Sequence, residues 1–264
     1  MSIEPLSGAA AAQMLRAMRE KRPLVHCLTN EVVQEITANV LLAAGASPAM
    51  VVAEEEAAYF AAAADALLVN VGTPYPARLR AMHASAESAA ANARPWVLDP
   101  VAAGGIPWRD GEIRKLLAKR PTVVRGNASE ILALAGAGAG GKGVDSTDAS
   151  SAAIVPAQHL AKASGAIVCV TGETDFITDG ERTLSVSGGH VMTTLVVGTG
   201  CSLSALVAAF CAASNDRLEA TAAACALAKR ASERAYAGRA CSGKLSRRLP
   251  RCALPHRARV VSFE

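Results

Sequence analysis

The chain alternates short, continuously apolar runs with longer alanine-rich segments of helical periodicity. This alternation is typical of βαβ units, whose strands lie parallel in one sheet. Because the runs are apolar throughout rather than at every second residue, helices should cover both faces of the sheet. We therefore predict an α/β fold, a three-layer α/β/α sandwich with a mostly parallel sheet. The six predicted strands lie within residues 23–29, 47–52, 66–72, 95–100, 121–127 and 166–172.

The pattern changes after residue 172. Residues 174–180 and 182–188 are short segments of alternating polarity joined by a turn, which is a hairpin signal, so we expect antiparallel edge strands. Two alanine-rich helical segments follow over residues 200–213 and 218–234. Residues 135–151 are too rich in glycine for a regular element and predict a flexible surface loop.

Length and composition exclude several classes of protein. A chain of 264 residues with this alternation is expected to form one body. No apolar run is long enough to span a membrane, and the first 23 residues lack a signal pattern, so we expect a cytoplasmic protein without a membrane partner. The seven cysteines lack CxxC spacing, which argues against a disulfide framework or a zinc site. No basic stripe with interleaved aromatic residues occurs in the body, so no nucleic-acid partner is expected.

The sequence "GTGC", Gly198 to Cys201, lies where a helix is predicted to begin. Glycines let the backbone approach a ligand, and the first turn of a helix offers unpaired N–H groups and the positive end of its dipole. Thr199 and Gly200 would thus help to form an anion hole for a phosphoryl group in transfer, although a packing turn fits the same residues. Cys201 would then face an approaching hydroxyl, either as a thiol of lowered pKa or as a small filler.

Polar residues at two other predicted strand ends support this interpretation, because ligands of parallel sheets bind outside the carboxyl ends of the strands. In "RGNASE", Arg125 is suited to phosphate, Asn127 to capping the next helix, and Glu130 to holding magnesium through water. Asp99, in "LDP", would supply a second carboxylate. The alternatives are a capping role for Asp99 and a solvated helix charge for Glu130.

Five motifs, in this order and spacing, carry a family resemblance: "PLVHCLTNEVVQEITANVLLAAGASPAM", "LDPVAAGG", "RGNASEI", "VTGETD" and "GTGCSLSALVAAF". Over residues 10–237 the chain resembles the hydroxyethylthiazole kinases, which are ribokinase-like enzymes. The resemblance implies ATP- and magnesium-dependent phosphorylation of the hydroxyl of 4-methyl-5-(2-hydroxyethyl)thiazole in thiamine biosynthesis or salvage. It also implies a homotrimer with active sites between subunits.

The resemblance assigns the candidate residues to four roles. Met50, Gly198 and Asn30 would contact the thiazole, and Arg125, Thr171 and Asn127 would contact ATP. Glu130 and Asp99 would position magnesium and its waters. Thr199, Gly200 and Cys201 would form the catalytic turn, with Cys201 at the position of the aspartate base of related sugar and vitamin kinases.

Two departures from the family pattern bear on this assignment. Leu195 and Val197 stand where the family often has lysine and threonine, so we expect weaker phosphate affinity. Residues 238–264 contain seven Lys or Arg and one acid in place of the family's usual last helix, which suggests an altered ending. We predict a single kinase domain over residues 1–237 and a disordered basic tail over 238–264. The alternatives are an ATP-dependent dehydratase of damaged nicotinamide cofactors, for which an aspartate would be expected at Cys201, and a non-catalytic ligand-binding subunit.

Overall fold

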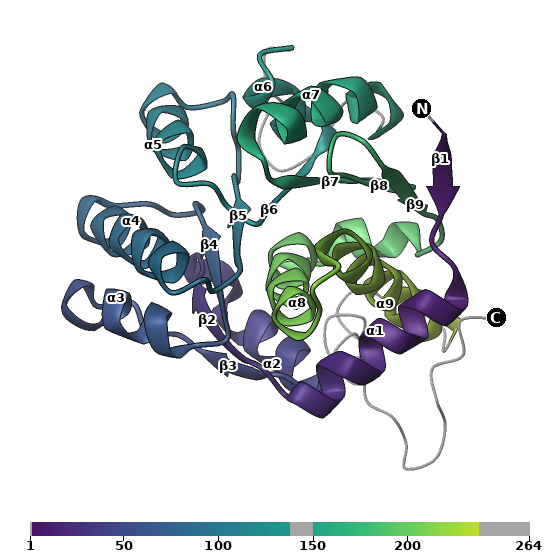
Figure 1. The fold of residues 1–264 in the computed structure, drawn as a ribbon, viewed down its shortest axis with the longest axis horizontal. Coiled ribbons are helices and arrows are strands. Elements are labelled where there is room, and N and C mark those ends of the chain that lie inside the picture. Colours follow the sequence, from purple (N-terminus) through teal and green to yellow (C-terminus); the bar gives the residue numbers. More distant parts are fainter. Residues whose placement is uncertain (1, 138–149, 238–264) are drawn as a thin grey trace.

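A computed structural model describes residues 2–137 and 150–237 of the protein, and in this part of the chain nine strands form one sheet (Figure 1). The strands lie in the order β1-β9-β8-β7-β6-β5-β4-β2-β3. Their bounds are β1 Ile3–Pro5, β2 Leu24–Leu28, β3 Ser47–Ala49, β4 Ala66–Asn70, β5 Trp96–Asp99, β6 Val123–Asn127, β7 Ile167–Thr171, β8 Asp175–Thr178 and β9 Thr183–Val186.

The six predicted parallel strands are confirmed as β2 to β7, which pair in parallel from β3 across to β7. The predicted hairpin is confirmed as β8 and β9, which pair antiparallel. The edge differs from the prediction, because the short strand β1 pairs in parallel with β9 outside the hairpin. Residues 3–5 are exposed and contain a proline, so their sequence has no apolar pattern that would predict a strand.

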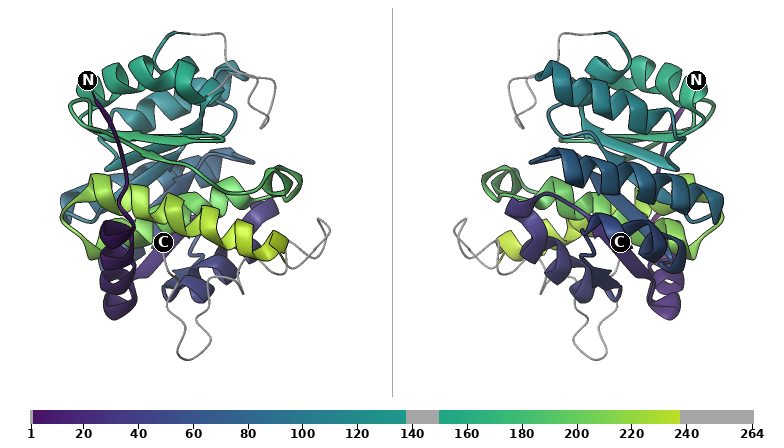
Figure 2. Two further views of the ribbon diagram at one scale, coloured as in Figure 1. Left: turned by 90° about the vertical axis from the view of Figure 1, so that its right-hand side faces the viewer. Right: turned by 90° about the vertical axis from the view of Figure 1, so that its left-hand side faces the viewer.

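Helices cover both faces of the sheet, as the continuously apolar strands predict (Figures 1 and 2). Helices α1, α2, α8 and α9 pack on one face and α3 to α7 on the other. The bounds are α1 Gly8–Lys21, α2 Gln34–Ala44, α3 Glu54–Ala63, α4 Pro76–Ala91, α5 Pro107–Leu117, α6 Ala128–Leu134, α7 Ile154–Ser164, α8 Thr199–Ala213 and α9 Arg217–Ala237. Three short 3-10 helices are η1 Glu31–Val33, η2 Ser150–Ala153 and η3 Val191–Leu195.

Helix α8 is the most deeply buried helix of its face. Every residue from Ser202 to Ala212 is buried, and a helix that is apolar all round must be enclosed on all sides. It packs against α1, α2 and α9 and against strands β2, β4 and β5. Because its start lies next to the carboxyl ends of central strands, this enclosure fixes the position of residues 198–201.

Two predictions fall wholly or partly outside the described residues. The tail that the sequence predicts to be disordered, residues 238–264, lies outside them, and so does most of the predicted loop, since residues 138–149 are not described. The division into a domain over residues 1–237 and a tail therefore stays a prediction. Among the described helices, none has the length and apolar character needed to cross a membrane.

Candidate active site

The predicted site residues lie where the order of strands along the chain reverses. After β2 the chain moves outward to β3 and returns through β4, which pairs with β2 on its other side. In parallel sheets such a switch point opens a crevice at the carboxyl ends of the strands. Asn30 follows β2 at this point, and Asp99 and Arg125 belong to the ends of β5 and β6.

The glycine turn before α8 has the conformation that its sequence requires. Gly198 caps the helix with a φ of 86°, a left-handed value that favours glycine. A Cβ at this position would also lie 2.7 Å from Ile36 Cγ2. Thr199 begins the helix and donates its hydroxyl to the carbonyls of Thr193 and Val196, at 3.4 and 3.3 Å. The turn is thus held by hydrogen bonds within residues 193–199 and by its close approach to α2.

Arg125 lies directly against this turn. A Cβ on Gly200 would be 2.8 Å from Arg125 Nη1, so a side chain at this position would displace the guanidinium. Arg125 Nη2 donates to Thr171 Oγ1 at 2.5 Å, and Nη1 lies 4.0 Å from Asp99 Oδ2. Burial lowers the pKa of Arg125, but nearby negative charges, above all that of Asp99, outweigh this and raise it, so the guanidinium stays charged. The structure brings together Arg125, Thr171, Asp99 and the glycine turn.

Glu130 is buried, 6% exposed, which excludes the alternative of a solvated helix charge. Its Oε2 accepts from the Asn127 backbone N–H at 2.9 Å, while Asn127 Oδ1 accepts from the Glu130 backbone N–H at 2.9 Å. This capping box, with the predicted Asn127 cap, starts helix α6. Glu130 Oε1 accepts from Ala102 N–H at 2.9 Å. Burial, and next the charge of Asp99, raise the pKa of Glu130 to about 7.

Asp99 is held at one oxygen by neutral donors. Asn70 Nδ2 donates to Asp99 Oδ2 at 2.7 Å, and Ser204 Oγ donates to the same oxygen at 2.8 Å. Burial raises the pKa of Asp99, while Arg125, Ser204 and Asn70 lower it without cancelling the rise. Asp99 is thus part of a buried polar cluster rather than a helix cap.

Cys201 adjoins this cluster, because its Sγ accepts a hydrogen bond from Asn30 Nδ2 at 3.5 Å. The sequence left open a lowered pKa for this thiol, and the structure contradicts it. Burial, and next the charge of Asp99, raise the pKa of Cys201 to about 12, although Asn70, Arg125 and Asn30 each lower it. A thiol with a pKa raised in this way stays protonated near neutral pH.

Met50 and Asn30, two of the predicted thiazole contacts, differ in burial. Met50 follows the edge strand β3 and packs, half-buried, against the core cluster that includes α2 and α8. Asn30, by contrast, is 5% exposed and joins the buried polar cluster directly. Within the described residues, no group of three or more His, Cys, Asp or Glu side chains is arranged to hold a metal ion.

Three residues of the site have no place in the sequence-based assignment. Asn70 ends the apolar run of β4 just as Asp99 ends that of β5, and this shared position is the signal that could have identified it. Ser204 lies one helical turn after Gly200. Lys229 of α9 donates to the carbonyls of Gly172 and Glu173, at 3.0 and 2.9 Å, and so holds the loop that follows Thr171.

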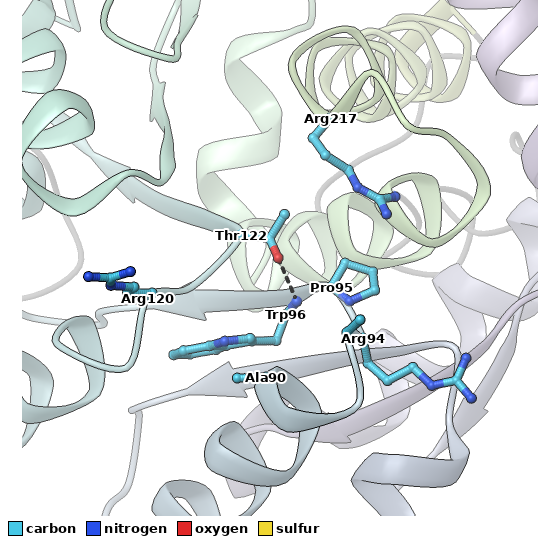
Figure 3. A pocket seen from close by; sticks show the side chains of 8 residues that line it. Ala90, Arg94, Pro95, Trp96, Arg120, Thr122 and Arg217 are labelled. Carbon is cyan, nitrogen blue, oxygen red and sulfur yellow. Dashed lines mark hydrogen bonds between the residues drawn. The ribbon is translucent and has the colours of Figure 1, made fainter.

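A separate pocket of about 250 Å³ opens at the opposite, amino-terminal ends of the strands (Figure 3). Trp96 begins β5 and Thr122 precedes β6 on its wall, and Arg94, Arg120 and Arg217 also line it. Figure 3 shows the side chains of Arg94 and Arg120 extending in opposite directions, so the pocket does not gather its positive charges at one point.

Comparison with known proteins identifies relatives of this chain in sequence and in structure. Residues 15–249 match the profile of the hydroxyethylthiazole kinase family. A hydroxyethylthiazole kinase of Escherichia coli O6:K15:H31 is 55% identical over 237 residues, 90% of this chain and 90% of the relative. The structure of a hydroxyethylthiazole kinase from Pyrococcus horikoshii OT3 superposes with a TM-score of 0.84 at 36% identity, covering 92% of both chains. A ribokinase-like superfamily protein from Enterococcus faecalis V583 shares the fold, with a TM-score of 0.65 at 15% identity over 95% of both chains.

Proposed function

The chain belongs to the hydroxyethylthiazole kinase family, and we propose that it transfers the γ-phosphoryl group of ATP to the hydroxyl of 4-methyl-5-(2-hydroxyethyl)thiazole in thiamine salvage. The observation that carries the proposal for the site is the position of Arg125. Its guanidinium lies between Asp99 and the bare backbone of Gly200, at the start of α8. Phosphoryl transfer depends on positioning and charge stabilisation, and this arrangement supplies both.

The charge on the migrating phosphoryl group would be met from two sides. Backbone N–H groups of residues 199–201 are the unpaired donors of the first turn of α8, and the helix dipole adds to their effect. Arg125 would face the same group, held by Thr171 Oγ1 in a buried position where charge is weakly screened. We infer that Arg125, Thr171 and Asn127 lie beside the ATP phosphates.

Magnesium fits the two carboxylates of the site. Asp99 and Glu130 offer hard oxygen ligands, and each Glu130 oxygen accepts a single backbone N–H, which leaves it a further lone pair. Two protein carboxylates suit an ion that keeps several waters and takes its other ligands from phosphates. When bound, the ion would neutralise charge on the phosphates, while Asp99 and Glu130 would hold its waters.

Cys201 would contact the acceptor alcohol without removing its proton. A thiol whose pKa is about 12 is a poor base near neutral pH. A loose transition state requires little proton removal before the phosphoryl group moves, so charge stabilisation carries the rate. Asn30 donates to Cys201 Sγ and would line the thiazole pocket with Gly198 and Met50.

We infer a homotrimer whose subunits meet at the glycine turn. Val32, Val191, Leu195 and Val197 are large apolar side chains that are 63–74% exposed. They belong to η1, to η3 and to the residue before Gly198, and the contacts of Gly198 with Val33 and Ile36 place these segments side by side. Exposed apolar residues gathered in this way favour burial by another copy of the chain.

The proposed activity is tested by ADP release from the purified full-length protein with ATP, magnesium and the thiazole alcohol. We expect release that depends on the alcohol, and a particle of three chains by light scattering. Release with hydrated NADH but not with the alcohol would favour the dehydratase, and no release with either would favour a non-catalytic subunit. Either result would refute the kinase proposal, and a monomer would refute the trimer.

A further inference from the structure

Asn70 is the side chain that joins the two halves of the site. It ends β4, next to β2 on one side and β5 on the other, and it is fully buried. Its Nδ2 donates to Asp99 Oδ2 at 2.7 Å, and its Oδ1 accepts from Asn30 Nδ2 at 3.0 Å. One amide group thus contacts a carboxylate suited to magnesium and an amide suited to the acceptor.

The orientation of the Asn70 amide is determined by its partners. The backbone N–H of Gly72 donates to Asn70 Oδ1 at 3.0 Å, and a backbone N–H can only donate. The ionised carboxylate of Asp99 can only accept. A rotated amide would therefore face a donor with a donor and an acceptor with an acceptor, so one orientation is strongly preferred.

The same logic orients Asn30. Its Oδ1 accepts from the Val32 backbone N–H at 3.1 Å, which turns Nδ2 toward Asn70 and Cys201. Gly72 allows the close approach, since a Cβ there would lie 2.7 Å from Asn30 Cβ. A directed chain of hydrogen bonds therefore runs from Val32 through Asn30 and Asn70 to Asp99.

We propose that Asn70 is a positioning residue that sets the acceptor side of the site and the metal side relative to each other. The proposal rests on the proposed function, in which Asn30 contacts the thiazole alcohol and Asp99 holds magnesium. Because Asn70 contacts both residues, loss of its side chain weakens binding on both sides. Its effect passes through Asn30 and Asp99 rather than through contact with the reacting atoms.

Ser204 provides a matched control. It donates to the same Asp99 oxygen at 2.8 Å, and its other hydrogen bond goes to the Gly200 carbonyl at 3.4 Å. Ser204→Ala therefore disturbs Asp99 without removing a hydrogen bond from Asn30. Asn70→Ser is a second variant, because a single hydroxyl group on a shorter side chain replaces the amide that contacts both Asn30 and Asp99.

The experiment measures two half-saturating concentrations, one for Mg²⁺ and one for the thiazole alcohol, in the full-length protein and in Asn70→Ala, Asn70→Ser and Ser204→Ala. Thermal unfolding in the presence of ADP gives the Mg²⁺ concentration at which half of the maximal rise in melting temperature is reached. Calorimetry gives the Kd of the thiazole alcohol. We expect the magnesium value to rise about three- to tenfold in all three variants, as loss of one hydrogen bond predicts. The Kd of the alcohol should rise by a similar factor in Asn70→Ala and Asn70→Ser and stay unchanged in Ser204→Ala.

An alcohol Kd that stays unchanged in Asn70→Ala, or that rises equally in Ser204→Ala, would overturn the proposal. If Asn70→Ala does not unfold cooperatively, Asn70→Ser decides in its place, because an unchanged alcohol Kd in that variant would also overturn the proposal. Both readouts are binding measurements and need no turnover. If the variants show the predicted pattern of binding but the wild-type protein has no kinase activity, the role of Asn70 is supported and the proposed function is refuted.

Discussion

Replacing Glu130 by glutamine removes a buried negative charge and should make the stability of the metal-free protein less dependent on pH. Burial and Asp99 raise the pKa of Glu130 to about 7 from an ordinary 4.5. The folded protein therefore holds this proton more tightly than the unfolded chain does. The sign follows directly: stability is greatest below the unfolded pKa and falls as pH rises through the folded pKa.

The size of the effect follows from the shift in the pKa. One pKa unit corresponds to about 1.4 kcal/mol, so a shift from 4.5 to about 7 removes roughly 3 kcal/mol once pH exceeds both values. Between about pH 5 and about pH 8, Glu130 should lower the free energy of unfolding by about 2.5 kcal/mol. Glutamine does not titrate, so this part of the slope should vanish in the variant.

Urea unfolding at several pH values, with a chelator present, measures the slope in the wild type and in Glu130→Gln. The glutamine side chain loses one of the two backbone hydrogen bonds, which shifts stability by a constant amount and leaves the slope interpretable. Equal pH slopes in the two proteins would refute the claim that burial holds the Glu130 proton.

Three other variants or treatments test the geometry. Gly200→Ala should lower kcat about ten- to a hundredfold in steady-state assays, because the new Cβ would lie 2.8 Å from Arg125 Nη1 and displace the guanidinium. In the control variant Gly111→Ala the new Cβ meets no atom within 4 Å, so kcat should stay unchanged. Equal kcat values in the two variants would contradict this. Alkylation of Cys201 by iodoacetamide, followed by mass spectrometry, should be slow near neutral pH and accelerate with rising pH, because burial raises the thiol's pKa to about 12; a rate that levels off near neutral pH would reveal a thiolate. Phe210→Ala removes a side chain that is 1% exposed in α8 and should lower the free energy of unfolding by about 3–5 kcal/mol, and a loss below about 1 kcal/mol in urea would exclude the buried position.

The sequence is most informative about the sheet, because each central strand is a continuous apolar run with few competing interpretations. Strand β1 escapes prediction, since residues 3–5 are exposed and their place is fixed by pairing with β9 rather than by their own pattern. The hairpin of β8 and β9 carries its own turn signal and is predicted correctly.

Site residues are predictable from the sequence where the residue type itself indicates the chemistry. Properties that depend on burial, such as a shifted pKa, are not. Arg125 and Asp99 follow from strand-end positions, and the Asn127–Glu130 capping box follows from spacing. The raised pKa of Cys201 does not, because the spacing shows a helix start but not the depth at which the thiol is buried. Asn70 gave only a faint signal, since one asparagine after an apolar run fits many loops.

The most direct test of charge stabilisation as the source of rate compares Cys201→Ala with Arg125→Ala at saturating ATP, magnesium and thiazole alcohol. Cys201→Ala should keep at least about a tenth of the wild-type kcat, because a protonated thiol is not the base. Arg125→Ala should lose at least about a hundredfold, because it removes the guanidinium beside Gly200. An inactive Cys201→Ala that still binds both substrates, together with an Arg125→Ala close to wild type, would contradict the account.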